Sequence, residues 1–576
     1  MPHFRKAGAG GQAHITGSDD SKIHIVKKND KLFSHANQGF LFFYLDMGAT
    51  CASLSLNMSK YTKGDLTPVV PRRFRPIFFM LVSCFALWGL LNNMTDNLVP
   101  AFKNIFTIPQ EQAALVQVAF YGAYAVLAIF ASILIEEFSY KKGVLIGLGV
   151  YIAGALCYIP ACINQDFEIY FIAIFVVASG CSVLETTCNP YVISLGPEKT
   201  AVRRLNFAQA FNPVGSIAGI LLAQQLILSN LNPATADERK VMPADQLKEI
   251  VHNELFWVCA PYVGLCIIAF LIWMFFLRVK DAQETSETGE QAEATGNGSG
   301  LRVLIAALFA IVPLVTLYFL FPDMNKVTWV LCGTLGPIVY LFLVGSYREM
   351  LFSLLSQPRY WCGVIAQFFY VGVQIAAWTY LNVYCCKELD VTAATAASYY
   401  LISLVLFIIC RWVATYYMKK FNPASMMSLF AIGAIACCAG TIYLPSTVLF
   451  SICGLDFSAN VICLIAMSGC MSLMFPTIYG IALGGLSQRD VKLGAAGLIM
   501  AILGGALITP WMAGIIGDAD SAWLFLTSSF DNTWDTNWGT SHAAVRASFI
   551  VPAICFAVVL VYSLIFRKPS TPASEQ

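Results

Sequence analysis

The sequence predicts an all-α polytopic membrane protein of fourteen spans, on three observations: few charges, high hydropathy and recurring long apolar runs. Hydrophobic residues make up 58% of the 576 residues, and Asp, Glu, Lys and Arg together make up 12%, against about a quarter in soluble domains. The mean hydropathy is +0.68. Such a chain has too few polar groups to cover a surface in water, so we expect most of its surface to face hydrocarbon.

The apolar runs, each long enough to cross a bilayer at about 20 residues, fall into two sets of six. The first set lies near residues 76–98, 113–135, 143–163, 169–195, 207–228 and 256–277. Two further runs lie at 303–321 and 327–344, and the second set begins near residues 360, 394, 425, 461, 493 and 545. An even insertion leaves the orientation of the second set unchanged, so the sequence predicts two six-helix bundles with an inserted helix pair.

Polar segments divide the chain into parts. We expect an N-terminal tail at residues 1–75, a first bundle at 76–278, a linker at 279–301, the inserted pair at 302–346, a second bundle at 347–567 and a C-terminal tail at 568–576. Lys and Arg are enriched in cytoplasmic loops. Basic residues gather in the loops on the side of the N-terminus, among them Arg72, Lys141, Arg203, Arg278, Arg359, Lys419, Arg489 and Arg567. This pattern predicts a protein of the plasma (cell inner) membrane with both termini cytoplasmic.

The charge and cysteine patterns exclude several classes of function. A net charge of +1 provides no field for nucleic acid. The 19 Cys lie mostly in apolar runs without CxxC or Cys/His clusters, so we expect no metal, cofactor or disulfide. The six His, at loop or tail positions, do not suggest an enzyme, and a channel would lack the two-half design. We expect a monomer.

Two carboxylates lie within the first bundle's spans. Asp96 follows the polar residues Asn92, Asn93 and Thr95 in the first span, and Glu185 lies deeper, in the fourth. A carboxylate at membrane depth costs about 2.5–3.5 kcal/mol on insertion scales, so it indicates a function. We interpret both as groups that take up and release a proton in a central cavity. The alternatives are a helix-end position in the headgroup region for Asp96 and a neutralising hydroxyl partner for Glu185.

The fifth span carries three amides at spacings of three and six, Asn206, Gln209 and Asn212, which places them on one flank of a helix. Amides both donate and accept hydrogen bonds, so they can bind sugar hydroxyls without adding charge. The alternative is that they join helices to one another, at about 0.6 kcal/mol per contact.

A second polar stripe lies in the first span of the second bundle. It follows i, i+3, i+7 and i+11 spacing and consists of Gln367, Tyr370, Gln374 and Trp378, with Tyr380 nearby. Aromatic faces stack on the C–H faces of a pyranose, and amides bind its hydroxyls. Core packing is the alternative for the aromatic residues.

With these residues in place, the chain resembles the L-fucose:proton symporter family of the major facilitator superfamily from about residue 75 to 567. The resemblance rests on the blocks Asn92-Asn93 to Asp96, Leu184-Glu185-Thr186 with Asn189-Pro190, Arg204-Leu205-Asn206 to Asn212, Tyr370-Val371-Gly372 with Gln374 and Trp378, and Phe475-Pro476-Thr477. The chain departs from the family pattern at Thr95, at Cys410 and in the inserted pair, which leaves the sugar preference and the role of the insertion open.

The resemblance implies two six-helix bundles that work by alternating access in a bilayer, with a sugar and a proton as substrates. It implies that Asp96 couples transport to the proton, and that Glu185 binds sugar and shares in protonation. The residues expected to bind sugar with Glu185 are Asn93, Asn206, Gln209, Asn212, Tyr370, Gln374 and Trp378. A glucose/galactose or N-acetylglucosamine transporter, or a sodium-driven one, is the alternative. The inserted pair carries no charge in its first run, so we expect it to lie outside both bundles.

Overall fold

The computed structural model describes residues 69–96, 98–108, 113, 115–234, 238–239, 241–279, 300–321, 326–517 and 540–568. Most of the expected N-terminal tail and linker lie outside these residues. The chain divides into two compact units, at residues 1–63 and 64–576, and the second contains all the described residues.

The first half of this unit is helical in the residues that the structure describes. Its main helices are α2 (Arg75–Asp96), α3 (Leu98–Ile105), α5 (Leu115–Glu137), α6 (Tyr140–Leu156), α7 (Tyr158–Asn164), α8 (Phe167–Ser194), α9 (Ala201–Gln209), α10 (Asn212–Leu222) and α12 (Ala244–Arg278). Side-chain caps fix two of the starts: Ser139 accepts from the Lys142 N–H before α6, and Asp166 accepts from the Glu168 N–H before α8.

The second half repeats this plan and adds a small hairpin. Its helices are α16 (Pro358–Glu388), α17 (Ala393–Tyr417), α18 (Pro423–Tyr443), α19 (Ala459–Met471), α20 (Met474–Leu483), α21 (Gln488–Met500), α22 (Gly504–Gly517), α24 (Thr540–Ala547) and α25 (Ile550–Ile565). Strands β1 (Val448–Ile452) and β2 (Leu455–Ser458) pair antiparallel between α18 and α19.

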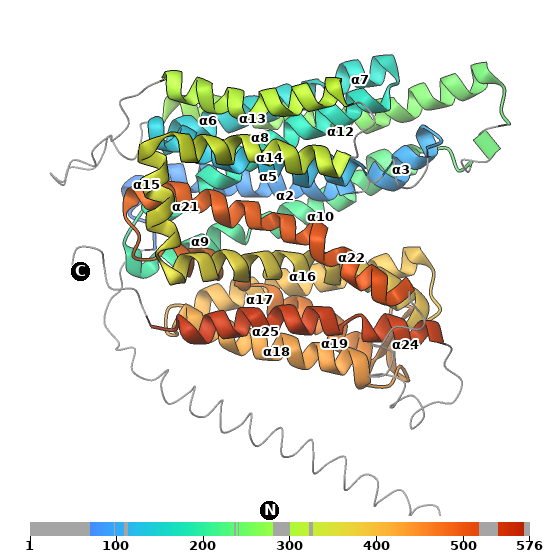
Figure 1. The fold of residues 1–576 in the computed structure, drawn as a ribbon. Helices are drawn as coiled ribbons and strands as arrows, with labels where there is room; N and C mark the ends of the chain where they lie inside the picture. The colour runs from blue at the N-terminus through green and yellow to red at the C-terminus, as the bar shows by residue number, and fades with distance from the viewer. Residues whose placement is uncertain are drawn as a thin grey trace, which may run out of the picture. The chain divides into compact units, whose positions relative to one another are not determined.

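The insertion forms α13 (Gly300–Leu320), α14 (Lys326–Leu343) and a short third helix, α15 (Gly345–Leu355). Figure 1 shows α13 and α14 beside the first half, where both contact α5. In the described residues, thirteen helices are long and apolar enough to cross a membrane, and α14 with α15, bent by 102°, adds a fourteenth as one broken span. The predicted all-α polytopic fold is confirmed.

Glycines let equivalent helices of the two halves approach closely. A Cβ on Gly215 would lie 1.9 Å from the Ala86 carbonyl oxygen, so α10 and α2 pack nearly backbone to backbone. In the second half, a Cβ on Gly504 would lie 2.1 Å from the Phe368 carbonyl oxygen, which brings α22 equally close to α16. Small residues commonly permit such contacts between membrane helices.

The two halves meet at the end of the bundles where α5 finishes. Glu136 of α5 accepts from Arg489 Nε at 3.0 Å and pairs with Lys492 Nζ at 3.1 Å, both from α21. Near the same end, Glu198 accepts from the backbone N–H of Gly485. Glu136 is only 4% exposed and Lys492 is 13% exposed, whereas Arg489 is 44% exposed, so the pair with Lys492 is the better shielded from water.

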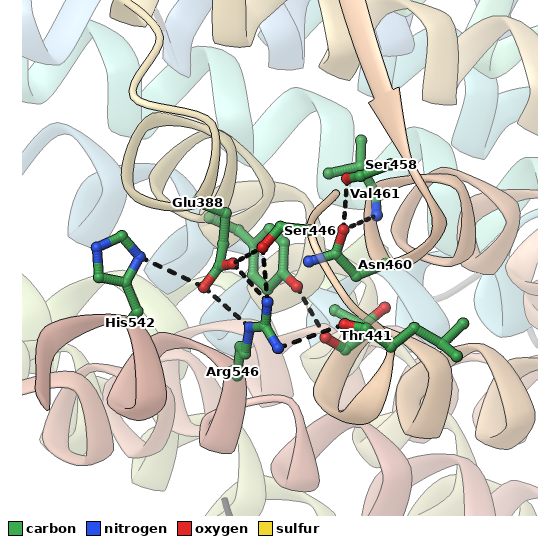
Figure 2. A network of polar contacts seen from close by, with 10 residues as sticks. Glu388, Thr441, Ser446, Ser458, Asn460, Val461, His542 and Arg546 are labelled. Carbon is green, nitrogen blue, oxygen red and sulfur yellow. Dashed lines mark hydrogen bonds and ion pairs between the residues drawn. The ribbon is translucent and has the colours of Figure 1, made fainter. Parts of the chain in front are cut away.

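At the opposite end, each half carries a buried Arg–Glu pair of its own. In the first half, Arg239 donates to both oxygens of Glu254 at 2.6 and 2.7 Å. In the second half, Arg546 of α24 donates to both oxygens of Glu388, the last residue of α16, with His542 on the other side of that carboxylate. Figure 2 shows this network, which Ser446 extends. Bidentate pairs of this kind fix loops in one position.

Candidate proton and substrate site

Glu185 lies near the middle of α8 and is 1% exposed. Neither of its carboxylate oxygens has a hydrogen-bond partner among the described residues. Tyr124 of α5 and Tyr479 of α20 interact with it electrostatically. The Tyr124 hydroxyl lies beside the Cys181 thiol, and the Tyr479 hydroxyl has no hydrogen-bond partner among the described residues. A buried carboxylate without partners is costly, and binding a proton or a ligand donor removes that cost.

Two amides connect the backbone of Glu185 to α9. Asn189 Nδ2 donates to the Glu185 carbonyl oxygen at 3.0 Å, and Gln209 Nε2 donates to Asn189 Oδ1 at 2.7 Å. The structure therefore brings Glu185 and Gln209 into one network through Asn189. In the sequence, Asn189 stands out only as part of the Asn189-Pro190 motif.

The three amides of the fifth span do not share one set of partners, because the helix is interrupted at residues 210–211, between α9 and α10. Asn206 Nδ2 donates across to Thr477 Oγ1 of α20 at 3.2 Å, whereas Asn212 Nδ2 donates to the Phe85 carbonyl oxygen of α2 at 3.4 Å. Asn206 Oδ1 is buried without a partner, so it remains an open acceptor where the halves meet.

Asp96 is the last residue of α2, and nothing is described of its side chain. Its neighbour Thr95 lies 3.0 Å, hydroxyl to hydroxyl, from Tyr262 of α12. Asn93 donates to the Gly89 carbonyl oxygen. The structure therefore places the Asp96 backbone at a helix end.

The stripe of α16 is placed against α19. The Tyr370 hydroxyl donates to the Met471 carbonyl oxygen at 3.0 Å, and Trp378 Nε1 donates to Ser468 Oγ at 3.1 Å. Gln374 and Tyr380 are partly exposed. Gln367 is fully buried, and neither atom of its amide has a partner in the described part of the chain.

Arg411 of α17 is a residue that sequence reasoning did not select. It is 3% exposed, and it donates from Nη1 to the Gln209 carbonyl oxygen at 3.0 Å and from Nε to the Ser472 carbonyl oxygen. Pro213 and Pro476 stand four residues after these carbonyls, and proline has no N–H to bond them. Arg411 thus satisfies two carbonyls, one from each half. The sequence does show Arg411 as a cation within an apolar span, and such a cation carries a cost like that of a carboxylate.

The sequence profile described as Major Facilitator Superfamily matches residues 77–482. The chain is 35% identical over 495 residues to the L-fucose-proton symporter of Haemophilus influenzae, covering 86% of this chain and 97% of that protein. It is 26% identical to a glucose/galactose transporter of Brucella abortus, covering 85% and 93%.

Among solved structures, a variant of the E. coli fucose:proton symporter FucP superposes with a TM-score of 0.64 at 28% identity, covering 86% of this chain and 100% of that one. A second structure of FucP, described as in the outward conformation, gives a TM-score of 0.63. With the two-half helical fold described above, these matches show that this chain is a multi-pass membrane protein of the Major Facilitator Superfamily.

Proposed function

We propose that the protein is a proton-coupled symporter of a monosaccharide, with L-fucose as the first candidate, and that it works by alternating access. The observation that carries this proposal is Glu185, a buried carboxylate without partners next to an amide network, at the meeting of the two halves. The 35% identity to a curated L-fucose-proton symporter over nearly its whole length supports the choice of substrate.

In this proposal, Asp96 and Glu185 exchange the proton, and Glu185 also binds a sugar hydroxyl. Asn93, Asn206, Gln209 and Asn212 supply amides from the first half. Tyr370, Gln374 and Trp378 supply a ring face and an amide from the second. An amide can donate and accept at once, so such a site suits neutral polyols.

The positive-inside pattern supports placing the end closed by Glu136 and Arg489 in the cytoplasm, with both termini on that side. The ion pairs of Glu136 hold the halves together there, which fits a state open to the outside. Binding of sugar and proton would favour closure at the other end and rupture of these pairs. A monomer contains all of these groups.

A glucose/galactose transporter is the second candidate, favoured by the Brucella abortus relative. Uptake into proteoliposomes separates the two. Labelled L-fucose is added under an imposed inward proton gradient, then under a sodium gradient at equal pH, with unlabelled L-fucose, glucose, galactose or N-acetylglucosamine as competitors. We expect accumulation only under the proton gradient, with L-fucose the strongest competitor.

A matched pair of variants ties this activity to the site. Glu185→Gln removes the charge at the buried carboxylate, and Glu249→Gln makes the same change at an exposed position of α12. We expect only Glu185→Gln to stop accumulation. Sodium-driven uptake would overturn the proton mechanism. Equal uptake by both variants would overturn the assignment of Glu185.

A further inference from the structure

The helices α13 and α14 are fastened along the first half. Trp329 Nε1 of α14 donates to the Leu314 carbonyl oxygen of α13 at 2.7 Å, which ties the pair together. Val330 packs on Gly122 of α5, where a Cβ would lie only 2.6 Å away. The Tyr318 hydroxyl of α13 donates to Glu168 at the start of α8 at 3.2 Å. The pair is therefore a rigid part of the first half.

The short helix α15 follows α14 and turns away from it by 102°. Its buried residues, Tyr347, Met350 and Leu354, lie on one face at i, i+3 and i+7. This face contacts both halves at their cytoplasmic end as proposed above. We call α13, α14 and α15 together the arm.

The first contact of α15 is with the end of α5. The Tyr347 hydroxyl donates to Glu137 Oε1 at 2.7 Å, and Arg302 of α13 pairs with the same oxygen at 3.2 Å. Glu137 is 2% exposed and Tyr347 is 1% exposed, whereas Arg302 is 45% exposed, so the Tyr347 bond is the one shielded from water. Its neighbour Glu136 holds Arg489 and Lys492 of the second half. Adjacent carboxylates thus connect α5 to the arm and to α21.

The second contact of α15 is with α21 itself. A Cβ on Gly494 would lie 3.4 Å from Leu354 Cδ2, which shows how closely Leu354 approaches that helix. One turn earlier on α21, Asp490 accepts from the Ser353 hydroxyl at 3.3 Å. The same helix therefore binds Glu136 and packs against α15 (Figure 1).

We propose that the arm is a brace between the halves, and that Ser353 and Leu354 are positioning residues that favour the state closed at the Glu136–Arg489 end. This inference rests on the proposed alternating access. The arm moves with the first half, so separation of α21 from α5 must also break the Leu354 contact and leave Ser353 and Asp490 without each other. A contact made in one state only shifts the balance toward that state.

The test measures the distance between the halves and needs no substrate. Spin labels are introduced through a non-natural amino acid at Lys142 and Lys419, two exposed positions at this end of the first and second halves. The variants are Ser353→Ala, which removes the hydroxyl that bonds Asp490 of α21, and Leu354→Ala, which removes the packing on α21. Tyr318→Phe is the control, because it removes the same group from an arm contact made within the first half.

We expect Leu354→Ala to raise the ratio of long to short distances by about tenfold, the effect of losing one buried contact, and Ser353→Ala to raise it by about threefold, because its bond to Asp490 is exposed. Tyr318→Phe is expected to leave the ratio unchanged. In transport assays, the arm variants should change kcat and KM together, as a shift between states does. Unchanged distances in both variants, or an equal shift in Tyr318→Phe, would overturn the brace. The distance readout stands even if sugar uptake fails, so the two proposals are tested separately.

Discussion

The polar residues of the two halves are used differently. In the first half, both carboxylate oxygens of Glu185 and the Oδ1 of Asn206 are buried without a hydrogen-bond partner among the described residues. In the second half, the Tyr370 hydroxyl and the Trp378 indole N–H donate hydrogen bonds to α19. Unsatisfied buried groups are costly, which supports the proposal that Glu185 and Asn206 meet a ligand, whereas Tyr370 and Trp378 are bonded within their own half.

Within the stripe of α16, Gln367 departs from this pattern. It is fully buried with both polar atoms unsatisfied, one turn from Tyr370. A group in this condition is expected to find a partner in another state of the transporter or in a bound ligand. In the proposed site, we therefore expect the first half to supply the charged group and Gln367 to supply a neutral one.

The largest effect on this difference between the two halves is expected from Glu185→Ala. We expect net transport to stop and sugar affinity to fall by about 1–3 kcal/mol, since a site built to pair a hydroxyl loses its partner. Isothermal titration calorimetry on purified protein measures the affinity, with Glu249→Ala as the exposed control. Unchanged affinity would remove Glu185 from the sugar site and leave it a proton site alone.

Asp96→Asn should have a narrower effect. Amidation removes the charge change that couples a proton to transport, while the backbone at the end of α2 is retained. We expect proton-driven accumulation to be lost and exchange of sugar across the membrane at equal concentration to remain. Counterflow assays in proteoliposomes measure exchange, and uphill uptake at the wild-type level would exclude Asp96 from coupling.

Arg411→Lys tests the link between the halves. Arg411 bonds two carbonyls with its planar fork, and the single ammonium of Lys cannot reproduce both bonds. We expect a loss of about 1–3 kcal/mol in stability or sugar affinity, read as thermal unfolding in detergent and as Kd. Arg278→Lys, an exposed change at the end of α12, is the control and should alter neither value.

Much of the fold could be predicted because a bilayer allows few solutions. Spans need about 20 apolar residues, and loop charges set their order, so the helices and the all-α class followed from hydropathy. The turn of α15 away from α14 did not, since residues 345–355 read as the start of the second bundle. That turn depends on contacts with Glu137 and Gly494, which are distant in sequence.

The charged residues of the candidate site could be predicted from the sequence, but the hydrogen bonds that join its residues could be predicted less well. A carboxylate within a span is visible in sequence, as Glu185 was, and Arg411 offered the same signal. The break between α9 and α10, however, sends Asn206, Gln209 and Asn212 to three different helices. A helical spacing rule assumes an unbroken helix. The two carbonyls that stand four residues before Pro213 and Pro476 accept from Arg411 instead of from a helix N–H, and only the folded structure shows this.

The smallest effect is expected from Tyr370→Phe. The Tyr370 hydroxyl already donates to the Met471 carbonyl oxygen, and Phe keeps the ring. Its loss should therefore lower the free energy of unfolding by about 1 kcal/mol and change sugar affinity less than about threefold.

Gln367→Met is its partner experiment: it removes an unsatisfied amide at nearly constant volume, so stability should hold or rise while affinity falls if the amide meets the sugar. A large loss of affinity in Tyr370→Phe, with none in Gln367→Met, would reverse the contrast and make the tyrosine hydroxyl a ligand for the sugar.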